Sequence, residues 1–267
     1  MTLEAVMVRS SAPLARRNPV AKLVAGTVFS LAVLATLDPL TPALAIAVEL
    51  VALPLFGVGF GVLLRRAWPI LVGVAGVMLT IVLFAAERTG ATVVTVGPLD
   101  VTTGVLTTAL GLGLRLVAIA LPGIMIFSTT DATDLADALV QNAKAPARFA
   151  IGALAAFRLV PLLGQEWQAL TLARRARGID AGYRPLAALR LFVSTAFALL
   201  VGAIRRGTRL AVAMDARGFD SGTPRTYARR QPFTAADWLF IAGTAAVAGA
   251  ILAVAVGTGT FRGLIGG

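Results

Sequence analysis

Residues 69–86, PILVGVAGVMLTIVLFAA, form an uncharged apolar run that is long enough to cross the hydrocarbon core of a bilayer as a helix. Similar runs occupy residues 23–37, 42–64, 101–127 and 238–256. Their lengths suit helical spans rather than short alternating strands. The chain of 267 residues is 58% hydrophobic, whereas soluble domains are roughly 45–50% apolar. The sequence therefore predicts an all-α membrane protein with about five transmembrane helices.

Two residue types that support much enzyme chemistry are missing, because the sequence contains no cysteine and no histidine. Disulfides, thiol nucleophiles and histidine-based metal or acid–base sites are therefore excluded. The sequence has no Gly-x-x-x-x-Gly-Lys-Ser/Thr loop, so we expect no ATP hydrolysis by this chain itself. Glycines 57, 59 and 61 fall inside the second apolar run, where we expect them to serve close helix packing.

Positive charge is concentrated in one segment of the chain. The net charge is +11, and residues 144–230 carry 15 lysines and arginines against four acidic residues. A soluble protein could use such a patch to bind nucleic acid. In a membrane protein the positive-inside rule instead places the segment in the cytoplasm, and we expect no nucleic-acid partner. Basic residues at 16–22 and 65–66 place the N-terminus on the same side.

These features divide the chain into three parts. Residues 1–127 are expected to form a membrane domain with four spans. Residues 128–234 are expected to form a cytoplasmic helical domain, inserted before the last span. Residues 235–267 contain that last span and the C-terminus. This arrangement predicts a multi-pass membrane protein whose N-terminus and inserted domain lie in the cytoplasm.

The first part of the inserted domain has two expected helices. Residues 128–143 suit a short helix, because Thr130 or Asp131 can cap its N-terminus. Residues 146–177 follow a helical pattern that is interrupted at Pro161, where we expect a kink or a break.

A further long helix is expected over residues 185–217, and it raises a question of topology. Its apolar stretch at 191–204 is shorter than the roughly 20 residues of a typical span. Arginines cluster on both sides of this stretch, which places both ends of the helix in the cytoplasm. We therefore expect the helix to lie at or under the membrane. A single span or a hairpin at 191–204 remains the alternative.

A basic heptapeptide occurs twice, as ARGIDAG at residues 176–182 and as ARGFDSG at 216–222. An arginine in the last turn of a helix followed by a glycine is a common helix-ending device. Capping alone does not explain why alanine and aspartate recur at the same offsets, so we expect two equivalent helix ends that dock into two equivalent pockets of a partner. The candidate docking residues are Ala176, Arg177, Gly178 and Asp180 in the first copy and Ala216, Arg217, Gly218 and Asp220 in the second.

The paired Ala-Arg-Gly motifs resemble those of the transmembrane T component of energy-coupling factor (ECF) transporters. The resemblance extends through STTDATDLADAL at 128–139, ARFAIGALAAFRLVPLL at 147–163 and Glu166. It covers residues 125–235, whereas the first four apolar runs match only as hydrophobic helices.

This resemblance implies an energy-coupling subunit of a transporter in a bacterial or archaeal plasma membrane. Two ABC-type ATPases would each receive one motif-bearing helix end, and a separate substrate-binding membrane protein, the S component, would respond to their motion. The substrate would be a vitamin or a transition-metal ion. ATP would be bound by the partner subunits, so no cofactor is expected in this chain. Membrane lipid is a further expected partner of the arginine clusters.

Two charged residues lie within the apolar runs: Glu49 in the second and Arg115 in the fourth. Charges at that depth are costly, so we expect these two to form an intramembrane pair. They also motivate a rival hypothesis, a secondary transporter with its own substrate path. The second rival is a membrane scaffold whose basic face binds lipid or nucleic acid.

Overall fold

The computed structural model describes residues 12–85, 89–96, 99–219, 221 and 226–260. The chain divides into two compact units. The bundle unit comprises residues 1–143 and 231–267, and the insertion unit comprises residues 144–230.

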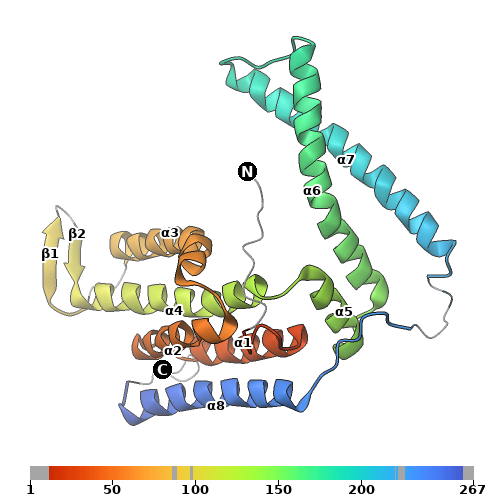
Figure 1. The fold of residues 1–267 in the computed structure, drawn as a ribbon. Coiled ribbons are helices and arrows are strands. Elements are labelled where there is room, and N and C mark those ends of the chain that lie inside the picture. Colours follow the sequence, from red (N-terminus) through yellow and green to blue (C-terminus); the bar gives the residue numbers. More distant parts are fainter. Residues whose placement is uncertain (1–11, 86–88, 97–98, 220, 222–225, 261–267) are drawn as a thin grey trace. The chain divides into compact units, whose positions relative to one another are not determined.

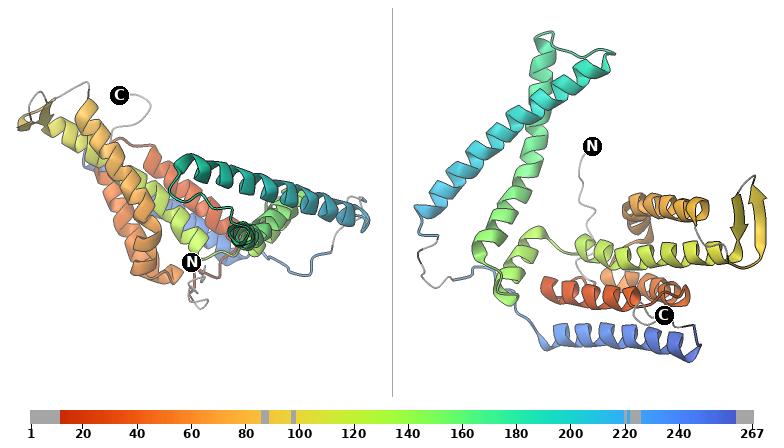
Figure 2. Two further views of the ribbon diagram at one scale, coloured as in Figure 1. Left: turned by 90° about the horizontal axis from the view of Figure 1, so that it is seen from above. Right: turned by 180° about the vertical axis from the view of Figure 1, so that it is seen from behind.

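Five apolar helices lie side by side in the bundle unit (Figures 1 and 2), with a short helix at one end and a two-stranded antiparallel hairpin at the other. The five are α1 (Pro19–Leu34), α2 (Leu40–Phe56), α3 (Phe60–Phe84), α4 (Thr103–Ser128) and α8 (Ala235–Gly257). The short helix is α5 (Ala132–Asn142), and the hairpin consists of β1 (Thr92–Val96) and β2 (Leu99–Thr102).

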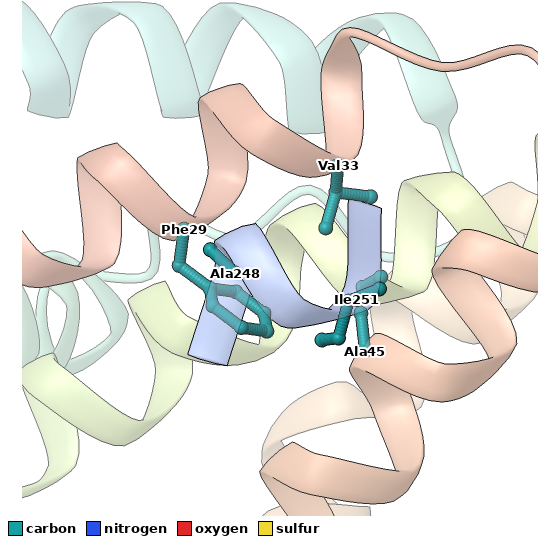
Figure 3. Close-up of a cluster of buried hydrophobic side chains, with 6 residues drawn as sticks. Phe29, Val33, Ala45, Ala248 and Ile251 are labelled. Atoms are coloured by element: carbon teal, nitrogen blue, oxygen red, sulfur yellow. The ribbon is translucent and has the colours of Figure 1, made fainter. Parts of the chain in front are cut away.

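Small side chains let four of these helices approach one another closely. Phe29 and Val33 of α1 pack against Ala45 of α2 and against Ala248 and Ile251 of α8 (Figure 3). Ala118 of α4 belongs to the same buried cluster. Such close packing around alanines is typical of membrane helices, whose association depends on close contact rather than on the hydrophobic effect.

The boundary between α2 and α3 differs from the sequence-based prediction. The second apolar run was expected to continue to residue 64, but α2 ends at Phe56 and α3 begins at Phe60. Gly57 adopts the left-handed φ of +70° and caps α2, a conformation that glycine adopts without strain. Gly57 and Gly59 therefore form the connection between two helices instead of packing inside one, and Pro69 lies within α3.

Within the described residues, five helices are long and apolar enough to cross a membrane, the number that the sequence predicted, but they are not the same five. The set that meets the length and hydropathy criteria is α3, α4, α6, α7 and α8. Helices α1 and α2 are shorter apolar helices of 16 and 17 residues. Hydropathy alone does not separate a helix that faces lipid from one whose apolar side covers another protein.

The insertion unit consists of two long helices, α6 (Ala147–Ala176) and α7 (Pro185–Asp215), which cross each other in Figure 1 and in the right view of Figure 2. Helix α6 continues through Pro161, so the expected division of this helix does not occur. At the crossing, the ring centres of Trp167 and Phe192 lie 5.1 Å apart.

Helix α5 packs with the bundle unit, so the insertion unit proper spans residues 144–230 rather than the predicted 128–234. Asp131 caps α5 by accepting a hydrogen bond from the Thr133 amide at 2.7 Å, which confirms one of the two predicted caps. Gln231 ties the other end of the insertion to α5, because its amide donates to Gln141 at 2.9 Å and its carbonyl accepts from Asn142 at 3.0 Å.

Candidate functional site

The first heptapeptide ends α6 with a Schellman motif. The amide of Ile179 donates to the carbonyl of Arg174 at 3.0 Å, and the amide of Gly178 donates to Arg175 at 2.9 Å. Gly178 has a φ of +74°. This pair of hydrogen bonds, around a glycine in the left-handed region, satisfies carbonyls that the helix end would otherwise leave free.

The second heptapeptide ends α7 with the same motif. The amide of Phe219 donates to Met214 at 3.1 Å, and the amide of Gly218 donates to Asp215 at 2.9 Å. Gly218 has a φ of +70°. The repeat in the sequence is therefore a repeat of backbone geometry, with an apolar residue after the glycine in each copy.

Both motif arginines present exposed side chains at these ends. Arg177 and Arg217 each precede the left-handed glycine, and both are exposed, as are Ala176 and Ala216. A guanidinium in this position can form two parallel hydrogen bonds with a carboxylate while remaining charged. The two ends can thus each offer a cation at the tip of a rigid helix.

The predicted aspartates of the two copies are Asp180 and Asp220. Asp180 is exposed and its carboxylate accepts a hydrogen bond from the Ala181 amide at 2.7 Å, which shapes the turn after the first motif. Asp220 lies outside the described residues. The acid of the first copy therefore acts locally on the backbone of its own turn.

The two motifs lie at opposite ends of α7, since the first directly precedes this helix and the second ends it. At 1.5 Å per residue, the 31 residues of α7 span about 46 Å. The two motifs are therefore far enough apart to contact two separate sites on a partner.

Arg174 fixes the first motif onto α7. Its guanidinium donates from Nη1 to the carbonyl of Leu191 at 3.2 Å and to the hydroxyls of Ser194 and Thr195 at 2.7 Å each. Thr195 is the buried residue of α7. In the sequence, Arg174 is only one of several clustered arginines, because contacts between two helices carry no sequence signature.

A second polar link between α6 and α7 is an ion pair between Glu166 and Arg206. Both side chains are about one third exposed, at 37% and 30%. Glu166 lies within the stretch that carries the family resemblance, but its partner is 40 positions away in the chain, and no sequence pattern links the two residues.

Glu49 and Arg115 do not form the predicted intramembrane pair. The guanidinium of Arg115 donates to the carbonyl of Thr36 and interacts electrostatically with Asp38. Both carboxylate oxygens of Glu49 are buried and have no hydrogen-bond partner among the described residues. The pairing fails because Arg115 reaches the α1–α2 connection, whereas Glu49 lines a cavity between α1, α2, α4 and α8 that Arg115 does not line.

A buried polar junction at the α5 end of the bundle was not anticipated. Lys22 is 1% exposed, and its ammonium donates to the carbonyls of Ala15 and Thr129 at 2.7 and 3.1 Å. Nearby, Asp237 accepts from the amides of Asn18 and Thr234 at 3.0 and 2.8 Å. The sequence showed Lys22 only as a flanking basic residue, because the acceptors that hold it are backbone carbonyls and threonine hydroxyls rather than a carboxylate.

Among the residues that the structure describes, no group of three or more carboxylates could hold a metal ion. The insertion unit thus presents exposed arginine side chains at its helix ends. These cations can bind acidic or polar groups of a partner.

The sequence matches the CbiQ family, described as cobalt transport protein, over residues 10–228. A Bifidobacterium longum protein whose name describes an ABC transporter ATP-binding protein is 28% identical over 250 residues, which cover 90% of this chain and 31% of that protein. The energy-coupling factor transporter transmembrane protein EcfT of Limosilactobacillus fermentum is 30% identical over 154 residues, 55% of this chain and 58% of that protein.

The EcfT protein of Thermosediminibacter oceani is 27% identical over 231 residues, which cover 83% of this chain and 86% of that protein. The chain therefore spans less than two thirds of the length of the Bifidobacterium and Limosilactobacillus relatives and most of the Thermosediminibacter one.

Proposed function

The chain belongs to the CbiQ family of cobalt transport proteins, and on this premise we propose that it is the energy-coupling transmembrane subunit of an ATP-driven ECF-type uptake system. In this role it transmits conformational changes of partner ATPases to a substrate-binding membrane protein. It performs no catalysis itself. ATP is bound and hydrolysed by the partners, and the imported substrate is a vitamin or a transition-metal ion.

The observation that carries this proposal is that the C-terminal ends of α6 and α7 have the same backbone geometry. Each ends in the same Schellman motif with an exposed arginine beside a left-handed glycine. Two equal ends fit a partner that has two equal pockets, and a pair of ABC-type ATPases offers such symmetry. Arg177 and Arg217 each bind an acidic or polar group in one ATPase.

The Bifidobacterium relative supports the ATPase partnership. The part that resembles this chain is only 31% of that protein, and the name of the whole describes ATP binding. An ATP-binding function and a segment like this chain thus occur in one polypeptide there. For the present protein, we propose that this chain and the ATP-binding proteins are separate subunits that associate in one complex.

An apolar stripe on α7 supports the contact with the substrate-binding membrane protein. Leu189, Val193, Phe197, Leu200 and Ile204 are all exposed, and their spacing puts them on one side of the helix. A helix with a continuous exposed apolar side buries it against a partner or against lipid. In the assembled complex this stripe packs against the S component, and the arginines around it contact membrane lipid.

The proposal is tested by co-purification of the tagged chain with the ATPase pair of its own genome. Arg177→Glu and Arg217→Glu are each expected to lower the amount of retained ATPase at least several-fold, because a charge reversal replaces a salt bridge with repulsion. The double variant is expected to retain none.

The matched control is Arg205→Glu, which makes the same change at an exposed arginine of α7 away from both helix ends. It is expected to retain the ATPases. Equal losses from all three substitutions would show that the helix ends are not docking sites, and no retention by the wild type would contradict the coupling function as a whole.

A further inference from the structure

The bundle unit contains an apolar cavity of about 370 Å³ between α1, α2, α4 and α8. Helices α2 and α8 touch at both ends of this cavity. At one end the rings of Phe56 and Phe240 meet edge to face with 6.1 Å between their centres. At the other, Ala45 packs against Ala248 and Ile251. The cavity lies between these two contacts, where side chains of α2 and α8 do not meet.

Small side chains leave the space between α2 and α8 unfilled. Ala52 of α2 and Gly243 of α8 line the cavity, and a Cβ added at Gly243 would meet no atom within 4 Å. The rim carries exposed apolar residues from both helices, Val48 and Leu55 on one side and Val247 on the other. The cavity is therefore reached from the apolar surface of the bundle.

Glu49 is the polar group of this cavity that lacks a partner. It lines the cavity, is only 6% exposed, and neither carboxylate oxygen has a hydrogen-bond partner within the described part of the chain. Lys22 also lines the cavity, but its ammonium is held by the carbonyls of Ala15 and Thr129. Thr244, a third polar lining residue, donates to its own helix at Phe240.

A buried carboxyl group without a donor is unusual, because burial removes its hydration and nothing replaces it. Ionisable groups inside membrane domains face cavities or partners and have a function by default. The cavity also has the size and the composition of a small-molecule site, mostly apolar walls with few polar groups. Both features indicate a ligand that supplies the missing donor.

We propose that this cavity binds a small amphiphilic amine, whose protonated amino group pairs with Glu49 and whose apolar body fills the space between α2 and α8. An ammonium group matches a carboxylate that has two free acceptor oxygens, and charge-assisted hydrogen bonds of this kind are the strong ones. The apolar walls select a compact hydrocarbon body. The ligand enters from the lipid-facing side, between Val48 and Val247. This site is independent of the ATPase-docking function.

The test uses the full chain in lipid nanodiscs and three probes that share one cage, 1-adamantylamine, 1-adamantanol and 1-adamantanecarboxylate. Binding of tritiated 1-adamantylamine is measured, with the other two as competitors. The wild type is expected to bind the amine saturably and at least tenfold more tightly than the alcohol. The carboxylate is expected not to compete.

Three variants complete the test. Glu49→Gln keeps the side-chain shape and is expected to lose the preference for the amine over the alcohol. Asp215→Asn makes the same carboxyl-to-amide change at an exposed site of α7 and is expected to leave binding unchanged. Gly243→Leu fills the cavity and is expected to abolish binding of the amine and the alcohol, and it serves as the second readout if Glu49→Gln folds poorly.

The proposal is overturned if the wild type binds no probe saturably, or if amine and alcohol compete equally. The cavity is then an apolar space occupied by lipid chains. An unchanged amine preference in Glu49→Gln would likewise overturn it, since the amino group would be recognised elsewhere.

Discussion

Gly178 and Gly218 hold a backbone conformation that other residues adopt only with strain. Their φ values of +74° and +70° lie in the left-handed region, where a Cβ costs roughly 1–2 kcal/mol. A Cβ at Gly178 would meet no atom within 4 Å, and one at Gly218 would lie 3.6 Å from Ser221. The requirement for glycine is therefore conformational rather than steric.

We predict that Gly178→Ala and Gly218→Ala each destabilise the local helix end by roughly 1 kcal/mol and weaken ATPase retention. Asparagine should be tolerated better than alanine, because it enters the left-handed region more readily. Thermal unfolding and co-purification measure the two effects.

The matched control for this substitution is Gly164→Ala in the interior of α6, where a Cβ also meets no atom within 4 Å. There alanine should stabilise the helix by about 0.4–1 kcal/mol. The same sign of change at all three glycines would contradict the conformational explanation.

The crossing of α6 and α7 depends more on Arg174 than on the Glu166–Arg206 ion pair. An ion pair with both side chains about one third exposed contributes about 0–1 kcal/mol, because solvent screens it. Arg174 donates to three acceptors, one of them on the buried Thr195, and hydrogen bonds from charged groups are worth about 1.5–3 kcal/mol. Arg174 is thus the main polar restraint on the angle between the two helices.

We predict that Arg174→Lys loosens this crossing, since a single ammonium cannot reproduce the guanidinium geometry. Spin labels at Leu172→Cys and Leu189→Cys, both exposed positions, should report a broader distance distribution in the variant. Arg175→Lys, one position along and exposed, is the control and should leave the distribution unchanged. Equal distributions in all three proteins would assign the crossing to apolar packing alone.

The distribution of charge is the basis for predicting how the chain is oriented in the membrane. The insertion unit holds most of the positive charge, which favours the cytoplasmic side. Yet α6 and α7 are also long and apolar enough to span a membrane. The side on which each end of α7 lies distinguishes these two topologies, because a span would separate the ends.

We predict that both ends of α7 lie in the cytoplasm and that the β1–β2 hairpin lies on the opposite side. Because the chain has no cysteine, single cysteines at Tyr183, Ser221 and Val94 can be labelled with an impermeant maleimide. In intact cells only the cysteine at Val94 should react, whereas all three should react after lysis. Reaction of the Tyr183 cysteine in intact cells would show that α7 crosses the membrane.

The sequence by itself determined the helical membrane class, the segment that carries the positive charge and the two glycine-terminated helix ends. These properties are local: an apolar run, a charge count or an Arg-Gly pair has the same consequence wherever the chain places it. The Schellman geometry at Gly178 and Gly218 was predictable for this reason, and so was the Asp131 cap of α5.

Only the tertiary structure decided the partners of the charged and polar side chains. Arg115 binds the carbonyl of Thr36 instead of pairing with Glu49, Arg174 holds α7, and Glu49 faces a cavity without a donor. Each outcome depends on which helices are neighbours and on how each is rotated about its axis. The packing of many small side chains determines both which helices are neighbours and how each is rotated. No short stretch of sequence encodes either property.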